Sequence, residues 1–566
     1  MEYTRNMVRE AEHEIRELVL SALGRLVASG AFPAEPVPAF VVETPADTAH
    51  GDFSTNAAMV CAKPFRAPPR KIAEAICTEL VLDGTHFVRA EVAGPGFLNF
   101  FLNHRWFGET VNEVLTQGDA YGNTNAGAGK RIVVEFVSAN PTGPMHIGNA
   151  RGGALGDGIV SMLNAAGYHA EREFYINDAG NQIEKFATSL EVRYLQLYKG
   201  EEAVPLPEDA YHGGDIVEHA KGFAALHGDA FVEVDSGERR KALVAYALPL
   251  NIKGLENDLR KYRIEYDTWF RESTMHETGE VERVVKLLTE RGHTYEQEGA
   301  TWFKGSEFDS EDYVLIRSNG IPTYIVPDIA YHYNKLEVRK FDRAVDVLGA
   351  DHHGYAPRLK AALSALGVDA SRLDIVIMQM VRLVRDGETV KVSKRTGKSI
   401  TLSTLLEEIP IDAARFYFNL REPNTHFEFD LGLAVEQTSQ NPVYYVQYAH
   451  ARICSILAAL KAEGVEPSTL PDESLSALDK PEELALIRHL AGLPNEINES
   501  ARHYDPSRIT RYALELATLF HKFYNACRVK GEEDRILRAR LALCFAVKTV
   551  LKNVLSLLKI TCPDSM

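Results

Sequence analysis

The sequence predicts an α/β protein with three parts: a parallel-sheet domain in the middle, a small α+β domain before it and an all-α bundle after it. At 566 residues the chain is longer than one hydrophobic core supports, so several domains are expected. In its middle, apolar strand-like segments alternate with helical ones, which is typical of a parallel sheet covered on both faces. Towards the end the strand signals fade and helical periodicity remains.

The first part covers residues 1–120. A helix is expected over Glu10–Leu26, where apolar residues recur at helical spacing. Short strands and turns follow it, among them the turn-rich segment 49–58 and the apolar segment 94–102. The Gly- and Asn-rich stretch 118–130 lacks apolar periodicity and is expected to be a linker or loop. This mixture predicts a small α+β domain.

The second part, residues 121–400, carries the predicted parallel sheet. A helix is expected from near His146 to Ala166, directly after the first strand. Residues from about 185 to 300 are helical and charged, and they are expected to form an insertion whose role the sequence does not define. In such folds ligands bind at the carboxyl ends of the strands. Strands are expected at Arg131–Val137, Glu171–Asn177, Tyr313–Ser318, Pro322–Val326, Ala344–Ala350 and Asp374–Val384.

The last part contains a connecting segment, 401–440, and amphipathic helices over 441–566, which predict a helical bundle. The formal charge of the whole chain is −17, but residues 488–560 hold 13 Lys and Arg against 7 Asp and Glu. A basic module on an acidic body suits the docking of one particular nucleic acid. A solvated helical face would give the same count.

The composition excludes several classes of protein. Hydrophobic residues make up 45% and charged residues 25% of the chain, as in an average globular protein, and no window approaches ~18 consecutive apolar residues. The charged, amphipathic start lacks the apolar core of a signal peptide. The six cysteines form no CxxC pair and no zinc-finger spacing. No membrane span, no export, reduced thiols and a cytoplasmic location are therefore expected.

The segment Val134–Gly158 holds the most informative chemistry. It ends a buried strand, turns at Pro141–Pro144 and begins a helix with the residues HIGN. A helix start offers unpaired N–H groups and a positive dipole end, so phosphates are favoured there. Gly148 leaves room for a flat purine, and His146 can donate to a phosphate oxygen. Taken alone, the motif is better explained by a histidine that only begins a helix.

A second basic loop, Lys391–Lys398, follows the last predicted strand. Its two lysines, Lys391 and Lys394, could hold a polyphosphate and neutralise the charge that develops during attack on an α-phosphate. A solvated basic turn is the alternative interpretation of this loop alone.

Together and in this order, the two segments resemble the HIGH and KMSKS motifs of class I aminoacyl-tRNA synthetases. The closer resemblance is to bacterial arginyl-tRNA synthetases, and it covers nearly the whole chain. It is carried by SANPTGPMHIGNARGG, EFYINDAGNQI, TYIVPDIAYH, GADHHGYAPRLKAAL and KVSKRTGK. Segments near both ends, such as HGDFSTNAA and NPVYYVQYAHARI, resemble the tRNA-binding parts of that family. The resemblance implies a Rossmann-like catalytic domain between an N-terminal tRNA-binding domain and an α-helical anticodon-binding domain.

The resemblance also implies roles for individual positions. The catalytic residues it implies are His146, Lys391 and Lys394. The residues implied to bind ATP are His146, Gly148, Asn149, Gly349, Asp351, His353, Lys391, Ser393 and Lys394. Those implied to bind arginine are Glu135, Ser138, Asn140, Asn149, Tyr324, Asp328 and His352. The HIGH-like region consists of Ala139, Asn140, Pro141, Thr142, Gly143, Pro144, Met145, His146, Ile147, Gly148 and Asn149.

Elementary chemistry is consistent with the two acids in this set. A guanidinium is a planar fork of five donors, which carboxylates bind best. Glu135 lies inside an apolar strand and needs a partner there. Asp328 could instead serve a helix start, because it directly follows Pro327, but the two acids match the family together. Asn149 replaces the second histidine of HIGH, which keeps a hydrogen-bond donor and removes a titratable group.

The implied activity is ATP-dependent attachment of L-arginine to its tRNA through an arginyl-adenylate, which yields AMP and pyrophosphate. ATP and Mg²⁺ are the implied small-molecule requirements, with no metal site in the protein itself. A monomer is expected, and the family needs bound tRNA before it activates arginine. The aromatic residues of a type suited to stacking on tRNA bases are Tyr444, Tyr445, Tyr448, Phe520 and Tyr524, of which most are expected in the core and one or two at the RNA.

Two other functions share some of these features. Another class I nucleotidyltransferase, which makes an acyl-adenylate of a small molecule, would carry both loops but not the paired acids and the long helical C-terminus. A non-catalytic RNA-binding or scaffolding relative would not need to retain His146, Lys391 and Lys394.

Overall fold

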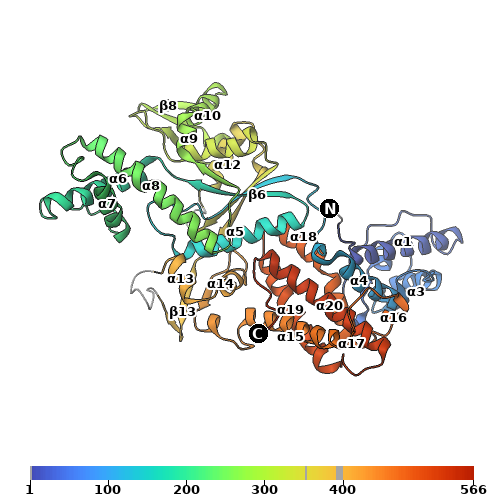
Figure 1. Ribbon diagram of the computed structural model, residues 1–566. Coiled ribbons are helices and arrows are strands. Elements are labelled where there is room, and N and C mark those ends of the chain that lie inside the picture. The colour runs from blue at the N-terminus through green and yellow to red at the C-terminus, as the bar shows by residue number, and fades with distance from the viewer. Residues whose placement is uncertain (1–2, 351–353, 391–399) are drawn as a thin grey trace.

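The computed structural model describes residues 3–350, 354–390 and 400–566. Figure 1 shows the N-terminal domain at one end, the helical C-terminal part next to it and the parallel-sheet domain beyond both. None of the helices in the described ranges is both long and apolar enough to cross a membrane.

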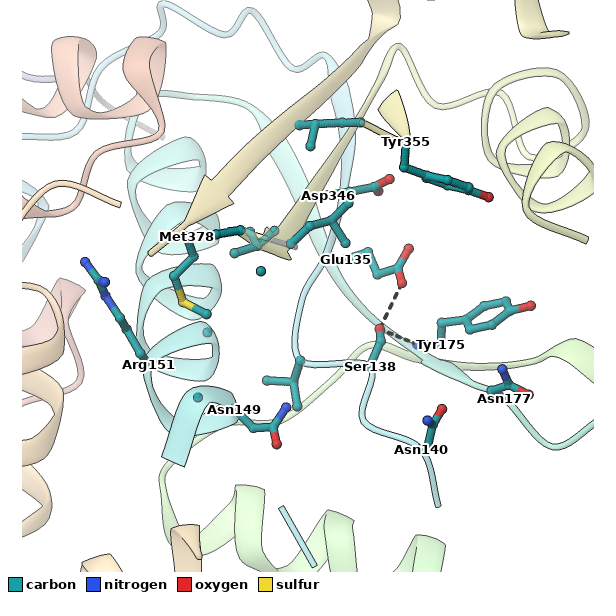
Figure 2. Close-up of a pocket in the computed structure, with 18 of the residues that line it drawn as sticks. Glu135, Ser138, Asn140, Asn149, Arg151, Tyr175, Asn177, Asp346, Tyr355 and Met378 are labelled. Atoms are coloured by element: carbon teal, nitrogen blue, oxygen red, sulfur yellow. Dashed lines mark hydrogen bonds between the residues drawn. The ribbon is translucent and has the colours of Figure 1, made fainter. Parts of the chain in front are cut away.

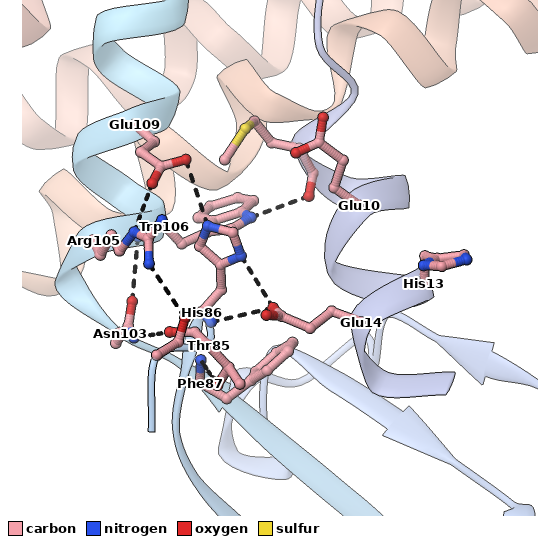
Figure 3. A network of polar contacts seen from close by, with 12 residues as sticks. Glu10, His13, Glu14, Thr85, His86, Phe87, Asn103, Arg105, Trp106 and Glu109 are labelled. Carbon is pink, nitrogen blue, oxygen red and sulfur yellow. Dashed lines mark hydrogen bonds and ion pairs between the residues drawn. The ribbon is translucent and has the colours of Figure 1, made fainter. Parts of the chain in front are cut away.

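The N-terminal domain packs helices against a four-stranded antiparallel sheet of order β1-β2-β4-β3. The side chain of His86 connects the two long helices of this domain (Figure 3). Its Nδ1 lies 3.0 Å from Glu14 on one helix, and its Nε2 lies 3.5 Å from Glu109 on the other. Trp106 adds a 3.1 Å hydrogen bond from its ring N–H to the carbonyl of Met7. The predicted α+β domain is confirmed. Its elements are α1 (Met7–Ala28), β1 (Val42–Glu43), η1 (Thr48–His50), β2 (Phe53–Thr55), α2 (Ala57–Cys61), α3 (Pro69–Glu79), β3 (Phe87–Ala93), β4 (Phe97–Leu102), α4 (His104–Gln117) and η2 (Gly118–Ala120).

The central sheet has five parallel strands in the order β12-β11-β5-β6-β7, which confirms the predicted parallel-sheet domain. The chain runs outward from β5 to one edge and later returns to the other side of β5. The order therefore reverses between β5 and β11, and a crevice is expected at the carboxyl ends of these two strands. The strands are β5 (Arg131–Glu135), β6 (His169–Ile176), β7 (Thr268–Arg271), β11 (Arg343–Gly349) and β12 (Leu373–Met378).

Helix α5 (Ile147–Ala165) follows β5 and packs closely against it, as predicted. Gly156 makes this approach possible, since a Cβ at that position would lie 2.1 Å from the ring of Phe136. The close packing fixes the first turn of α5 relative to the end of β5.

Three predicted strands differ in the structure. Tyr313–Ser318 contains β10 (Tyr313–Ile316), but β10 belongs to a separate antiparallel sheet with β8 (Thr294–Gln297) and β9 (Ala300–Phe303). Pro322–Val326 is not a strand, because α11 (Ile325–Tyr333) already begins there. Its Ile-Val pair suggested a strand, whereas the following Pro and Asp favour a first helical turn.

The long apolar run Asp374–Val384 divides into two strands. Its first half is β12, and its second half is β13 (Val381–Arg385), which pairs with β14 (Glu388–Thr389) and β15 (Phe427–Asp430) in another sheet. Periodicity alone could not locate this break, since both halves are equally apolar.

The expected insertion contains a separate helical unit and one strand of the main sheet. Helices α6 (Gly180–Lys199), α7 (Gly214–His227) and α8 (Ser236–Lys261) enclose a hydrophobic core of their own. In Figure 1 they extend away from the sheet on the side opposite the N-terminal domain. Strand β7 lies within 185–300 but pairs with β6, so this range is not one uninterrupted insertion.

The C-terminal part is a helical bundle, as predicted. Its helices are α15 (Pro442–Lys461), α16 (Asp472–Leu475), α17 (Pro481–Ala491), α18 (Leu493–His503), α19 (Ser507–Ala526) and α20 (Asp534–Leu557). The other helical elements are α9 (Glu272–Glu277), α10 (Glu280–Glu290), η3 (Gly305–Phe308), η4 (Asn334–Val338), α12 (Ala356–Ala365), η6 (Ala370–Arg372), α13 (Leu402–Glu408), α14 (Ile411–Phe418) and η7 (Leu433–Val435).

Candidate active site

A cavity of about 660 Å³ opens at the carboxyl ends of the central strands. Strand β5 contributes Glu135, β11 contributes Asp346 and the backbone to Gly349, and the first turn of α5 closes one side. Helix α11 contributes Asp328 from above the strand ends. The cavity therefore lies where the strand order predicts a ligand site, and Figure 2 shows its residues around one open space.

The backbone is strained where β5 enters the cavity. Val137 and Ser138 have φ of 69° and 39°, values that a β-branched residue such as valine rarely adopts. A hydrogen bond of 3.0 Å from the Ser138 N–H to the Phe136 carbonyl closes the tight turn. The turn places the Ser138 hydroxyl between two strands, where it donates to Glu135 at 2.9 Å and accepts from the Tyr175 N–H at 3.1 Å (Figure 2). The strained turn therefore orients the Ser138 hydroxyl, and this hydroxyl in turn orients the carboxylate of Glu135.

The carboxylate of Glu135 is buried and accepts one hydrogen bond at each oxygen. Besides the bond from Ser138, it accepts a 2.7 Å bond from the ammonium of Lys335, a residue of η4. An acid inside an apolar strand needs a partner, and Lys335 is that partner.

Asp328 has a different environment. Its carboxylate accepts a hydrogen bond from the Tyr355 hydroxyl, and within the described residues no cationic side chain pairs with it. Burial raises the pKa of Asp328 to about 6, with Glu135 and Glu272 adding to the rise and Tyr355 and His332 opposing it. The cavity thus contains one acid whose charge no described cation neutralises, which suits a cationic ligand.

The HIGH-like region lies between this cavity and a second one of about 1070 Å³. His146 precedes α5, is exposed and lines the second cavity, together with residues 142–144. Asn149 lines both cavities, and its side-chain oxygen accepts the N–H of His146 at 2.9 Å. Asparagine at this position therefore fixes the helix start through its oxygen and keeps its amide N–H₂ for other contacts.

The insertion reaches the same region from the other side. Asn251 of α8 donates to the carbonyl of Pro141 at 2.9 Å and contacts His219 of α7 at 2.7 Å. These bonds join the insertion to the turn that precedes α5.

The structure brings most of the predicted site residues together, with defined exceptions. Ser138, Asn140, Ile147, Gly148 and Gly349 line the first cavity with the two acids. Ala139 lines the second cavity, and Met145 is buried, with its carbonyl accepting from Leu402. Tyr324 is 75% exposed and is absent from the lining of the first cavity. The predicted residues Asp351, His352, His353, Lys391, Ser393 and Lys394 lie outside the described part of the chain.

Sequence reasoning missed several polar residues of the cavity. Asp346 gave the same signal as Glu135, a single acid in an apolar strand, and could have been found by it. Lys335 gave no signal, because nothing in its local sequence distinguishes it from an exposed lysine. The other polar residues of the cavity that were missed are Arg151, Tyr175, Asn177, Tyr331, His332, Tyr355 and Gln379.

Two groups of side chains in the described residues have the spacing of metal ligands. The group Glu135, His332 and Asp346 already surrounds the ammonium of Lys335. In the group His450, Cys454 and Asp564, the thiol donates to Asp564 at 3.2 Å. Neither group offers the set of free oxygens that Mg²⁺ prefers.

Comparison with known proteins agrees with this architecture part by part. Residues 13–102 match the family model "Arginyl tRNA synthetase N terminal domain", residues 110–430 match "tRNA synthetases class I (R), catalytic domain", and residues 446–566 match "DALR anticodon binding domain". The chain is 51% identical to the arginine–tRNA ligase of Ruminiclostridium cellulolyticum over 99% of its own length and 100% of the relative's. It is 53% identical to that of Caldanaerobacter subterraneus subsp. tengcongensis with the same coverage.

A solved structure shows the same fold. The structure of Thermus thermophilus arginyl-tRNA synthetase matches with a TM-score of 0.73 and 22% identity, covering 98% of this chain and all of that one. The resemblance inferred from the motifs is confirmed: the chain belongs to the arginyl-tRNA synthetase family of class I aminoacyl-tRNA synthetases.

Proposed function

We propose that this arginine–tRNA ligase binds arginine in the cavity at the carboxyl ends of β5 and β11, and ATP beside it at the start of α5. The observation that carries the proposal is Asp328, a half-buried acid that no described cation pairs with, on the same cavity as Glu135. Two carboxylates can accept from several edges of a guanidinium, and a shorter, compact ammonium would not reach both. Asn140, Asn149 and Ser138 are proposed to hold the amino-acid end, and Tyr324 and His352 are proposed to belong to the same arginine site.

The ATP end of the proposed site is the first turn of α5. Its N–H groups and dipole favour phosphate, and Gly148 has no atom within 4 Å of where a Cβ would stand. We assign His146, Lys391 and Lys394 to stabilisation of the phosphates during attack, and Gly349, Asp351, His353 and Ser393 to the rest of the nucleotide. Mg²⁺ enters as part of the ATP substrate, since the described acids offer it no separate site.

In the proposed reaction the arginine carboxylate attacks the α-phosphate, and pyrophosphate leaves. The terminal ribose hydroxyl of tRNA then takes the arginyl group, and AMP is released. The residues act by holding the reactants in line and by stabilising the charge that develops, as in other phosphoryl and adenylyl transfers.

The tRNA is proposed to dock on residues 1–120 and 441–566, the two ends of the chain, with 121–400 as the catalytic domain and 401–440 as the connection. In the C-terminal bundle, the guanidinium of Arg452 lies 4.7 Å from the ring centre of Tyr448 and 4.5 Å from that of Tyr524. This cluster borders a cavity and offers stacking surfaces to unpaired bases, whereas Phe520 is buried. A cytoplasmic monomer is part of the proposal.

Replacing Asp328 by asparagine tests the arginine site. D328N keeps the shape of the side chain and removes its charge. We expect KM for arginine in tRNA charging to rise about 30- to 1000-fold, because loss of one partner of a desolvated charge pair costs about 2–4 kcal/mol. KM for ATP should stay at the wild-type value.

The matched control is D309N, which changes an exposed acid of the neighbouring small sheet region. It should leave both KM values unchanged. An unaltered arginine KM in D328N would contradict the proposed site.

A further inference from the structure

The ammonium of Lys335 is wholly buried behind the proposed arginine cavity. Lys335 lies in none of the segments that carry the family resemblance. It is 0% exposed and lies on the π-helical turn η4 that follows α11. Its Nζ lies 2.7 Å from Glu135 and 3.0 Å from Asp346, and 4.0 Å from the ring centre of Tyr331. A lysine rarely becomes this buried unless its charge is paired, and here two carboxylates pair it.

The topology explains why a cation is needed at this point. Glu135 and Asp346 are register partners on the adjacent parallel strands β5 and β11. Both are at least nine-tenths buried, so two like charges would otherwise stand side by side with little contact with water. Their oxygens, with a nitrogen of His332, lie within 4.8 Å of one another, as metal ligands do. The ammonium of Lys335 occupies the position that such ligands would give a metal.

His332 completes the balance of charge. Its Nε2 lies 2.6 Å from the carboxylate of Asp346 and its Nδ1 lies 2.7 Å from the carbonyl of Asp328. Both partners are acceptors, so both ring nitrogens donate and the imidazole is charged. Burial lowers the pKa of His332, but Asp346 outweighs it and raises the pKa overall. Two anions and two cations therefore balance in this group.

The remaining charged groups that face Lys335 are already paired. Glu173 of β6 accepts from the Tyr331 hydroxyl at 2.6 Å and from two nitrogens of Arg339 at 2.5 and 2.8 Å. Burial lowers the pKa of Lys335, yet Asp346 and Glu135 raise it above its ordinary value. Lys335 is thus a permanent cation over the working pH range.

We propose that Lys335 is a positioning residue for arginine recognition: its ammonium bridges the carboxylates of Glu135 and Asp346 and fixes that of Glu135 towards the cavity. This inference rests on the proposed role of Glu135 in binding arginine. Without the ammonium, the carboxylates of Glu135 and Asp346 repel each other across the adjacent strands. Asp346 retains His332 as its partner, so Glu135 is the side chain that shifts, and it then meets the guanidinium poorly.

The test begins with Lys335→Met, which keeps the length of the side chain and removes the charge. At pH 7 we expect KM for arginine to rise about 10- to 100-fold, the loss typical of a hydrogen bond to a charged group, with KM for ATP unchanged. Lys340→Met is the matched control, because Lys340 follows the same turn and its side chain is 68% exposed.

A double-mutant cycle separates this role from a merely structural one. E135Q alone should raise the arginine KM, and adding K335M to E135Q should change it no further, because the carboxylate that Lys335 serves is gone. The double variant also removes a buried ion pair in balance, which protein cores tolerate better than a single loss. The comparison of E135Q with E135Q/K335M therefore decides the question even if K335M alone does not fold.

The outcomes distinguish the two claims. If E135Q leaves the arginine KM unchanged, the proposed role of Glu135 is wrong. If E135Q raises it but K335M leaves it unchanged, or if K335M weakens arginine binding equally in the E135Q background, the inference about Lys335 is overturned.

Discussion

At the scale of single residues, the site is organised by a balance of charge. Glu135, Asp346, Lys335 and His332 compensate one another, and Asp328 is the acid left without a cation among the described residues. A cationic side chain of a substrate would complete the balance. The sequence could predict Glu135 and Asp328 from their local patterns. It could not predict Lys335, because its partner Glu135 lies 200 residues away in the chain.

The pH dependence of arginine use follows from Asp328. Burial raises its pKa to about 6 in the free enzyme, so the carboxylate is charged above that pH and neutral below it. We expect kcat/KM for arginine to fall as the pH drops below about 6, because kcat/KM reports ionisations of the free enzyme. The D328N variant should lose this inflection, and D309N should keep it. The same inflection in D328N would assign it to another group.

At the scale of elements, the turn between β5 and α5 determines the geometry of the site. The strained turn at Val137 and Ser138 directs the Ser138 hydroxyl to Glu135. The first turn of α5 begins nine residues after Ser138, at Ile147. The sequence predicted both β5 and α5, since an apolar strand followed by a Pro/Gly turn and a long helix is a local pattern. It failed for β7, a short strand within charged helical sequence, because pairing with β6 rather than composition makes it a strand.

Alanine substitutions at two glycines of α5 should affect folding and nucleotide binding separately. Gly156→Ala puts a Cβ where Phe136 lies 2.1 Å away, so we expect it to destabilise the protein by about 1–3 kcal/mol, more than the gain in helix propensity. Gly148→Ala meets no atom within 4 Å and should leave the midpoint of thermal unfolding unchanged or slightly raised. It should instead raise KM for ATP, because the added methyl group stands in the proposed nucleotide site.

Thermal unfolding and ATP kinetics on both variants check this pair. A normal midpoint in G156A would contradict the packing of α5 on β5. A normal ATP KM in G148A would contradict the placement of the nucleotide.

At the scale of the whole molecule, buried ion pairs join the parts. Asp157 of α5 is fully buried and accepts from Arg172 at 2.7 Å, from Lys559 at 2.9 Å and from Arg415. These cations come from the central sheet, from the end of the C-terminal bundle and from the connecting segment. The helix that begins at the active site is thus held directly by the anticodon-binding part of the chain. Such long-range pairs give no local sequence signal, so the arrangement of the domains could not be predicted.

The N-terminal domain is fixed to the same bundle. Asp52 pairs with Arg488 of α17, and the side-chain amide of Asn112 donates to the carbonyl of Leu470 at 2.7 Å. Both proposed tRNA-binding parts therefore contact each other, and the C-terminal one also contacts α5.

The most direct test of the account is exchange of labelled pyrophosphate into ATP, measured with each of the twenty amino acids, with and without arginine tRNA. We predict exchange with arginine alone, and only when the tRNA is present. Exchange with arginine in the absence of tRNA would keep the activation step and remove the coupling to tRNA. Exchange with another amino acid, or none under any condition, would contradict the assignment of the cavity as the site of arginine activation.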